Sequence, residues 1–397
     1  MGQVEWMDRL EEKHDNFRAA LDWCFSNGDS EKLLRLFAAL TWTWNLRWSP
    51  SEARSWLEKI RTLPDVAVHR KVYARVLNAA VRREWLIANL NRARSLLEES
   101  RALWLSLGTD GNGGMAEALI LAGMLTWHDL DAAASYFAQS FELYQSTREP
   151  RGMALARFWL GHVSYDKNEY VSALAQLEES LDRFRELGAR WGMARVFQIL
   201  GQLFLRQGIY DTARLYFEQH LRLDEGFKEG TAVALTNLGD LYRYQHDDEQ
   251  AKRYYEKSLS LCREYGLNMD ASYNLYALGL LALHQGNHLL AKKYFHDYYI
   301  ANQGLADKSL LCDFLTGLGA GAAGMNQPER AAKLYGAAQA IFEIIDYRIS
   351  PFDRAEFDSH FRMAKQKPGD TKFESIAMEG RAMAMEQAIA YALENNK

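Results

Sequence analysis

The sequence predicts an all-α solenoid of about eight repeats, each made of two helices and about 40 residues long. The first observation is an alanine followed four residues later by a large apolar residue. Successive alanines of this kind lie 40 residues apart, except for one step of 38. The second observation is a Leu-Gly pair whose glycine precedes the alanine by twelve residues in five repeats. The alanine pairs are Ala53 and Leu57, Ala93 and Leu97, Ala133 and Phe137, Ala173 and Leu177, Ala213 and Phe217, Ala251 and Tyr255, Ala291 and Phe295, and Ala331 and Tyr335.

Each repeat is predicted to contain a helix A that carries the glycine and a helix B that carries the alanine. A glycine inside a helix costs about 1 kcal/mol relative to alanine. We expect close packing of the two helices to offset this cost, with the large residue of helix B filling the groove beside the glycine. Thr41 and Val81 replace the glycine in the first two repeats, which are assigned from their alanines alone. The glycine-bearing positions are Leu160-Gly161, Leu200-Gly201, Leu238-Gly239, Leu278-Gly279 and Leu318-Gly319, with Gly123 two residues closer to its alanine.

Both turns of the repeat carry residues that tolerate a left-handed backbone, which commonly ends a helix. One set lies five residues before the alanine and is predicted to end helix A. The other lies 13 or 15 residues after the alanine and is predicted to end helix B. Pro328 stands where a helix can begin. The first set is Asn168, Gly208, His246, Gly286 and Asn326, and the second is Gly108, Gly188, Gly226, Gly266 and Gly304.

The repeated Leu-Gly, aromatic and alanine pattern resembles a tetratricopeptide repeat array over about residues 30–345. The resemblance implies a right-handed superhelical solenoid whose A helices line the concave face. The repeats differ from the usual 34-residue unit because they are about 40 residues long. They also lack, in most cases, the proline that commonly closes that unit.

The two ends of the chain narrow the resemblance. Residues 5–29, 330–343 and 380–396 resemble parts of the C-terminal sensor region of large signal-transducing (STAND-type) ATPases, including maltose-activator-like transcriptional regulators. This implies N-terminal linker helices at 1–29, the repeat array at 30–345 and C-terminal capping helices at 346–397. The sequence contains no G-x-x-x-x-G-K-[ST] phosphate loop and no evident helix-turn-helix. We therefore expect a sensor portion that is separate from its ATPase.

Composition excludes several classes of protein. The formal net charge is −5, and no long basic run is present, which argues against direct nucleic-acid binding. Cys24, Cys262 and Cys312 are few and far apart, so we expect reduced thiols. No apolar run approaches the roughly 20 residues that cross a membrane, and residues 1–17 have no signal-peptide core. The expected location is the cytoplasm.

The sequence shows no catalytic constellation. His284 and His288 are four residues apart, but they lack a third metal ligand and are interpreted as solvated histidines near helix ends. The sequence has neither a G-x-S-x-G elbow nor a C-x-x-C pair. Acidic pairs such as Glu178-Glu179 are typical of exposed helix faces. We therefore predict a protein that is not an enzyme and that uses no metal or cofactor.

The candidate binding residues follow from the predicted concave face. Counted from the repeat glycine, the inward positions lie three residues before it, one after it, and four to five after it. Aromatic side chains beside Arg, Gln, Asp and His suit a polar ligand or a peptide, although any helix face carries some such residues. The candidates are Arg82, Trp85, Trp127, His128, Phe158, His162, Tyr165, Gln198, Gln202, Arg206, Asp240, Arg243, Tyr244 and Tyr276, joined by Asp166 and His284.

These features lead to two functional hypotheses. The first is a regulatory sensor that binds a small molecule, a protein or a peptide in the groove and controls an attached or partner ATPase. The second is a free-standing scaffold for protein–protein interaction. Tryptophan is concentrated at one end, since all eleven lie between Trp6 and Trp191. Four of them lie in the first repeat: Trp42, Trp44, Trp48 and Trp56. They could form an aromatic platform that stacks on sugar or purine rings, or a bulky core that packs against a neighbouring domain. We favour the core, which predicts exposed apolar surface near the N-terminus.

Overall fold

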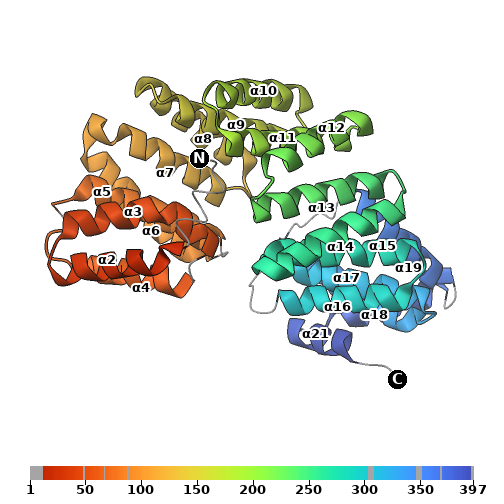
Figure 1. Cartoon of the computed structure of the whole chain (residues 1–397). Coiled ribbons are helices and arrows are strands. Elements are labelled where there is room, and N and C mark those ends of the chain that lie inside the picture. Colours follow the sequence, from red (N-terminus) through yellow and green to blue (C-terminus); the bar gives the residue numbers. More distant parts are fainter. Residues whose placement is uncertain are drawn as a thin grey trace. The chain divides into compact units, whose positions relative to one another are not determined.

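The computed structural model describes residues 12–47, 50–66, 68–86, 89–302, 308–345, 351–366 and 369–394, with side chains for all of these except 41–47, 50, 51, 345, 351 and 352. Over these ranges the chain forms α-helices and one short 3-10 segment, without strands (Figure 1). The chain divides into two compact units, Met1–Leu203 and Phe204–Lys397. The all-α prediction is confirmed.

The helices follow the predicted pairing of A with B. Helices α5 and α6, α7 and α8, α9 and α10, α13 and α14, α15 and α16, and α17 and α18 pack as such pairs. The bounds of the helices before the middle of the chain are α2 His14–Ser26, α3 Ser30–Arg47, α4 Pro50–Arg61, α5 Arg70–Leu86, α6 Leu90–Ser106, α7 Asn112–Leu125, α8 Leu130–Ser146, α9 Pro150–Asp166, α10 Tyr170–Glu186 and α11 Arg190–Arg206. Those that follow are α12 Tyr210–Leu223, α13 Lys228–Tyr244, α14 Asp248–Tyr265, α15 Asn268–His284, α16 His288–Ala301, α17 Lys308–Gly324, α18 Pro328–Ile345, α19 Pro351–Gln366, α20 Asp370–Arg381 and α21 Met385–Leu393.

The repeat glycines lie where helix A meets helix B. A Cβ built on Gly239 would approach the ring of Tyr255 to 2.6 Å, and one built on Gly123 would approach Phe137 to 2.4 Å. Gly161 meets Leu177 in the same way. The large residue four after the alanine therefore fills the space that the glycine leaves. Gly319 differs, because its nearest neighbour is Phe361 of α19.

The predicted turn residues have the expected backbone. All five residues predicted to end helix A have positive φ, from 60° at His246 to 74° at Gly208. Gly108, Gly188, Gly226 and Gly266 also have positive φ, whereas Gly304 lies outside the described residues. Helix α18 begins at Pro328 as predicted. Arg148 takes the glycine place after α8 and has a φ of 54°.

Buried serines add a contact that the sequence reasoning did not foresee. Ser180 of α10 donates a hydrogen bond of 2.8 Å to the carbonyl of Ala154 in α9. Ser140 and Ser258 make the same bond to Ala116 and Ala232. Each serine lies seven residues after a repeat alanine and is fully buried. The hydroxyl therefore ties helix B to a helix A carbonyl in successive repeats.

The tryptophans near the start of the first unit differ in exposure. Trp56 is buried in the core of this unit, while Trp23 of α2 is 58% exposed. The side chains of Trp42, Trp44 and Trp48 lie outside the described residues. Packing of this region against a neighbouring domain stays a prediction.

The three C-terminal helices pack on the repeats of the second unit in different ways. Helix α20 packs closely on α18, because Gly336 faces the backbone of Ala377 and Gly380 faces that of Lys333. Arg330 donates to the carbonyls of Tyr391 and Ala392 and so holds the end of α21. Helix α19 contacts α15, α17 and α18, and its end also contacts α20.

Candidate functional site

In the first unit, helix α9 presents two different faces. One face meets the B helices, since Arg157 lies 3.0 Å from Glu179 of α10 and stacks on Phe141 of α8. The other face carries His162 and Asp166, with Trp159 between the two faces, and all three are partly exposed at helical spacing. The Trp159 ring also stacks on Phe137 of α8, with centroids 5.7 Å apart. We call Trp159, His162 and Asp166, together with Trp127 from the turn after α7, the first-unit stripe.

The rings of the first-unit stripe pack against one another. The Trp127 ring lies 4.8 Å from His162 and 5.7 Å from Trp159, measured between centroids. Trp159 and His162 are nearly parallel, with centroids 5.8 Å apart. The indole N–H of Trp127 donates to Asp166 Oδ2 at 2.8 Å. The stripe thus combines flat aromatic surface with an imidazole and a carboxylate.

The other first-unit candidates have varied positions. Phe158 and Tyr165 are buried, at 5% exposure each, so they belong to the packing beneath the stripe. His128 is exposed in the turn before α8. Gln198 and Gln202 are partly exposed, four residues apart on α11.

Arg82 and Trp85 lie on α5. Arg82 Nη2 is 2.8 Å from Glu117 Oε1 of α7, and this carboxylate also accepts a hydrogen bond from Asn78. Trp85 is partly buried against the core of the first unit. Arg82 therefore ties the neighbouring A helices α5 and α7 together.

In the second unit, Arg243 is buried and belongs to a hydrogen-bonded network. Its Nη1 lies 2.7 Å from Asp353 Oδ1 of α19, and its Nε donates to the hydroxyl of Tyr255 at 3.3 Å. That hydroxyl donates to Asp240 Oδ1 at 2.6 Å, and Tyr273 also donates to Asp240. Burial raises the pKa of Asp240 to about 6. Two of the predicted site residues thus form a connected network with α19.

The remaining candidates in this unit differ in exposure. Arg206 is exposed, and Tyr244 is partly exposed with the Arg243 guanidinium 5.6 Å from its ring. Tyr276 is only 8% exposed, and its ring packs 6.0 Å from that of Phe295.

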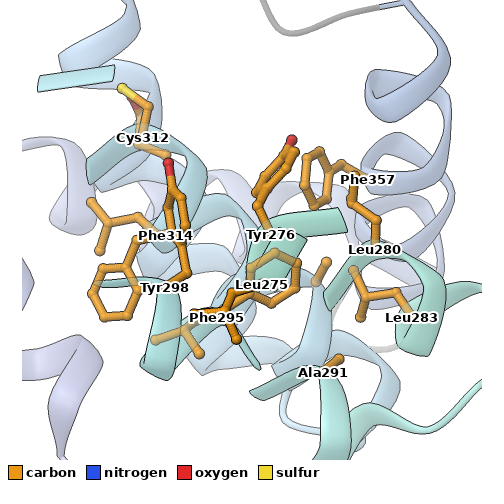
Figure 2. Packing of buried hydrophobic residues seen from close by; sticks show 14 of the residues in the cluster. Leu275, Tyr276, Leu280, Leu283, Ala291, Phe295, Tyr298, Cys312, Phe314 and Phe357 are labelled. Carbon is orange, nitrogen blue, oxygen red and sulfur yellow. The ribbon is translucent and has the colours of Figure 1, made fainter. Parts of the chain in front are cut away.

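Helix α19 explains the burial of Tyr276 and its neighbours. Phe357 packs into the cluster that contains Tyr276, Leu280 and Phe295 (Figure 2). Along α17 every residue from 311 to 322 is buried, and along α15 every residue from 274 to 283 is buried. The A-helix surface that was predicted to face a ligand is therefore covered here by the protein's own helix.

Sequence reasoning missed the α19 residues Asp353, Glu356, Phe357 and Phe361. The signal lies in the long runs without charged residues in α15 (275–283) and α17 (314–324). A helix of this kind is buried all round and needs a cover on its inner face as well. The stretch 351–366 supplies one, because its buried residues recur at helical spacing.

Histidines surround the α19 contact. His284 Nδ1 lies 3.2 Å from Glu356 Oε2, and the rings of His246 and His284 are stacked 5.7 Å apart. His288 packs edge-on against His360, and burial, with a smaller effect of His360, lowers the pKa of His288. Among the described residues, no group of three or more His, Cys, Asp or Glu side chains is arranged to hold a metal ion.

Within the same ranges, none of the helices combines the length and apolar character needed to span a bilayer.

Comparison with known proteins identifies the repeats. Tetratricopeptide repeat models match residues 152–226 and 232–265. Proteins of Mycobacterium tuberculosis and Mycobacterium bovis, each named "Putative HTH-type transcriptional regulator", are 27% identical over 190 residues. This match covers 46% of the chain but 21% of each relative, so it spans about a fifth of their length.

Solved structures share the fold. A Rap protein complexed with competence and sporulation factor has a TM-score of 0.60 at 12% identity, covering 91% of this chain and 99% of its own. Aspartyl phosphate phosphatase F of Bacillus subtilis has a TM-score of 0.54 at 12% identity, covering 97% and 96%. NprR in complex with its cognate peptide NprX has a TM-score of 0.53 at 13% identity, covering 90% and 97%. At these identities the likeness establishes an all-α helical repeat fold.

Proposed function

We propose that this chain is a non-catalytic binding module of a signalling or transcription-regulating protein, and that a peptide segment of a partner lies along the first-unit stripe. The main observation in support of this proposal is the row of partly exposed side chains of Trp159, His162 and Asp166 beside Trp127. Aromatic surface that alternates with hydrogen-bonding groups suits a peptide, which offers both apolar side chains and amides.

Two comparisons support this proposal. The Rap structure of the same fold is a complex with competence and sporulation factor, and the NprR structure is a complex with its cognate peptide NprX. The mycobacterial relatives are named as transcriptional regulators and are much longer than the matched stretch. In the proposed arrangement the module senses a ligand for a longer protein, in which an ATPase part responds. A ligand achieves this only by binding one conformation better than another.

A small effector is the second candidate ligand. It is favoured by the compact group of Trp127, Trp159 and His162 rings, whose centroids lie within 6 Å of one another. Such a group can stack on a planar ring. A free-standing scaffold remains the alternative role, and a reading frame without an ATPase would favour it.

The test is a selection of short peptides displayed on phage against the full chain, followed by fluorescence anisotropy with the enriched sequence. His162→Ala should weaken binding about ten-fold or more. Val171→Ser is the matched control, because Val171 is 87% exposed on α10 and is not one of the stripe residues. Equal affinity in His162→Ala and the control, or failure to enrich any peptide, would contradict the proposal.

A further inference from the structure

Helix α19 binds the second unit through one face only. Its buried residues recur three or four positions apart, with His360 and Phe361 adjacent, while Arg354, Met363 and the other residues between them are exposed or partly exposed. This is the pattern of an amphipathic helix lying on an apolar surface. The buried residues are Asp353, Phe357, His360, Phe361 and Ala364.

The contacts of α19 run across successive repeats. Asp353 pairs with Arg243 of α13, and Glu356 lies beside His284 of α15. Farther along, Phe357 packs on Phe295 of α16, with centroids 6.5 Å apart. Phe361 packs on Tyr335 of α18, with centroids 4.4 Å apart, and also lies against Gly319 of α17. We call this surface, from Arg243 to Tyr335, the second-unit groove.

The position of α20 shows that α19 does not simply extend the stack. Helix α20 makes the close backbone contacts with α18 through Gly336 and Gly380. Helix α21 is held separately by Arg330. Helix α19 is therefore seated on the repeats as a ligand helix would be, with anchors at i, i+4 and i+8.

We propose that the second-unit groove is the binding site for an amphipathic helix of a partner protein, and that α19 occupies it as an intramolecular competitor. The partner helix carries a carboxylate four residues before the first of two aromatic residues that are themselves four apart. This is the spacing of Asp353, Phe357 and Phe361 in α19.

The charge of the groove selects this chemistry. Arg243 is 8% exposed, and its ion pair with Asp353 crosses from the repeats to α19. An occupant without the carboxylate would remove that partner from a buried cation, which is costly. A basic residue at the same place would add repulsion. The groove thus accepts acidic-aromatic helices and rejects basic ones. This surface is separate from the first-unit stripe, so the inference goes beyond the function proposed above.

The test uses a fluorescein-labelled peptide of residues 351–366 as the probe and the full chain as the receptor. In wild type, α19 competes with the probe. In the Asp353→Asn/Phe357→Ala chain this competitor is weakened, while every groove residue is unchanged. We expect the probe to bind the variant at least about ten-fold tighter than wild type, measured by anisotropy.

Three controls make the result specific. A probe with the same Asp→Asn and Phe→Ala changes should bind the variant chain at least about ten-fold more weakly than the original probe. Met363→Ser in the chain alters the exposed face of α19 and should leave probe binding as in wild type. Circular dichroism checks folding, and the single Asp353→Asn chain replaces the double variant if the latter unfolds.

Equal affinity for wild-type and variant chains would overturn the proposal, as would the absence of binding to the folded variant at about 1 mM probe. Either result would make α19 a fixed structural cover. His162→Ala leaves the groove intact, so it should not change probe binding, which keeps this test distinct from that of the first-unit stripe.

Discussion

At the scale of single residues, the close packing of helix A on helix B depends on a position that has no side chain. Gly239 is needed because the Tyr255 ring occupies the space of its Cβ. Gly321 of α17 is also a helical glycine, but the nearest atom to its Cβ position is a carbonyl oxygen 3.7 Å away. Glycine is therefore required by the packing at position 239 but not at position 321.

We expect Gly239→Ala to destabilise the protein by about 1–3 kcal/mol, since the added methyl group overpacks the helix contact. Gly321→Ala is the control and should be neutral or stabilising by up to about 1 kcal/mol, because alanine favours the helix. Urea unfolding followed by circular dichroism measures both. Similar effects of the two substitutions would show that the Tyr255 contact is not the reason for Gly239.

Arg148 has a left-handed backbone conformation, which is strained for arginine but not for the glycines at the same place in other repeats. Its φ is 54°, in the region where other repeats have glycine. We predict that Arg148→Gly stabilises the chain by about 0.5–1 kcal/mol, the left-handed strain exceeding the added freedom of the unfolded glycine. Thermal unfolding is the measurement. Ser146→Gly, within the regular last turn of α8, should instead destabilise by about 0.5 kcal/mol, and a stabilising effect there would contradict this explanation.

The raised pKa of Asp240 predicts that the stability of the protein depends on pH. Its folded pKa is raised by burial to about 6, above the unfolded value of about 3.9. Its contribution to stability is therefore full below about pH 4 and is lost as the pH rises through about 6. Asn at this position can still accept from Tyr255 and Tyr273 but does not titrate.

We expect the difference in unfolding free energy between wild type and Asp240→Asn to change by about 2–3 kcal/mol from pH 4 to pH 7, with wild type losing relative stability. Urea unfolding at several pH values gives both curves. Parallel curves would mean that Asp240 keeps an ordinary pKa.

At the scale of elements, the sequence was informative where local chemistry decides. The 40-residue period predicted the helix pairs, and Asn168, His246 and Asn326 predicted turns because their short or planar polar side chains tolerate positive φ. The cover formed by α19 was not predicted, because Arg243 and Asp353 are 110 residues apart and no local pattern connects them. The inward positions counted from the glycine also did not distinguish buried Phe158 from partly exposed His162.

The serine bonds give a prediction for a whole class of helix pairs. Ser180 donates to the Ala154 carbonyl in a fully buried site. We expect Ser180→Ala to cost about 1 kcal/mol, the usual net value of one such bond, and Ser140→Ala to cost about the same. Exposed Ser135 of α8 provides the control, since Ser135→Ala should change stability by less than about 0.5 kcal/mol. A negligible effect in both buried variants would show that the repeated bond is not stabilising.

At the scale of the whole molecule, each unit has a core of its own. Phe137 lies in the first unit's core and Phe295 in that of the second, and both are fully buried. In repeat proteins stability is approximately a sum of local and nearest-neighbour terms. Loss of packing in one unit should therefore open that unit first.

We predict that Phe295→Ala, which should cost about 3–5 kcal/mol, accelerates amide hydrogen exchange in α15–α17 by about 100-fold or more while α5–α8 keep their wild-type protection. Phe137→Ala is the reciprocal variant and should affect α7–α9 while leaving α15–α17 protected. Exchange followed by mass spectrometry of peptic fragments resolves the two sets of helices. If each variant instead raised exchange evenly over the whole chain, the two units would unfold as one cooperative body, and a ligand on the first-unit stripe would then stabilise the second-unit groove to the same extent.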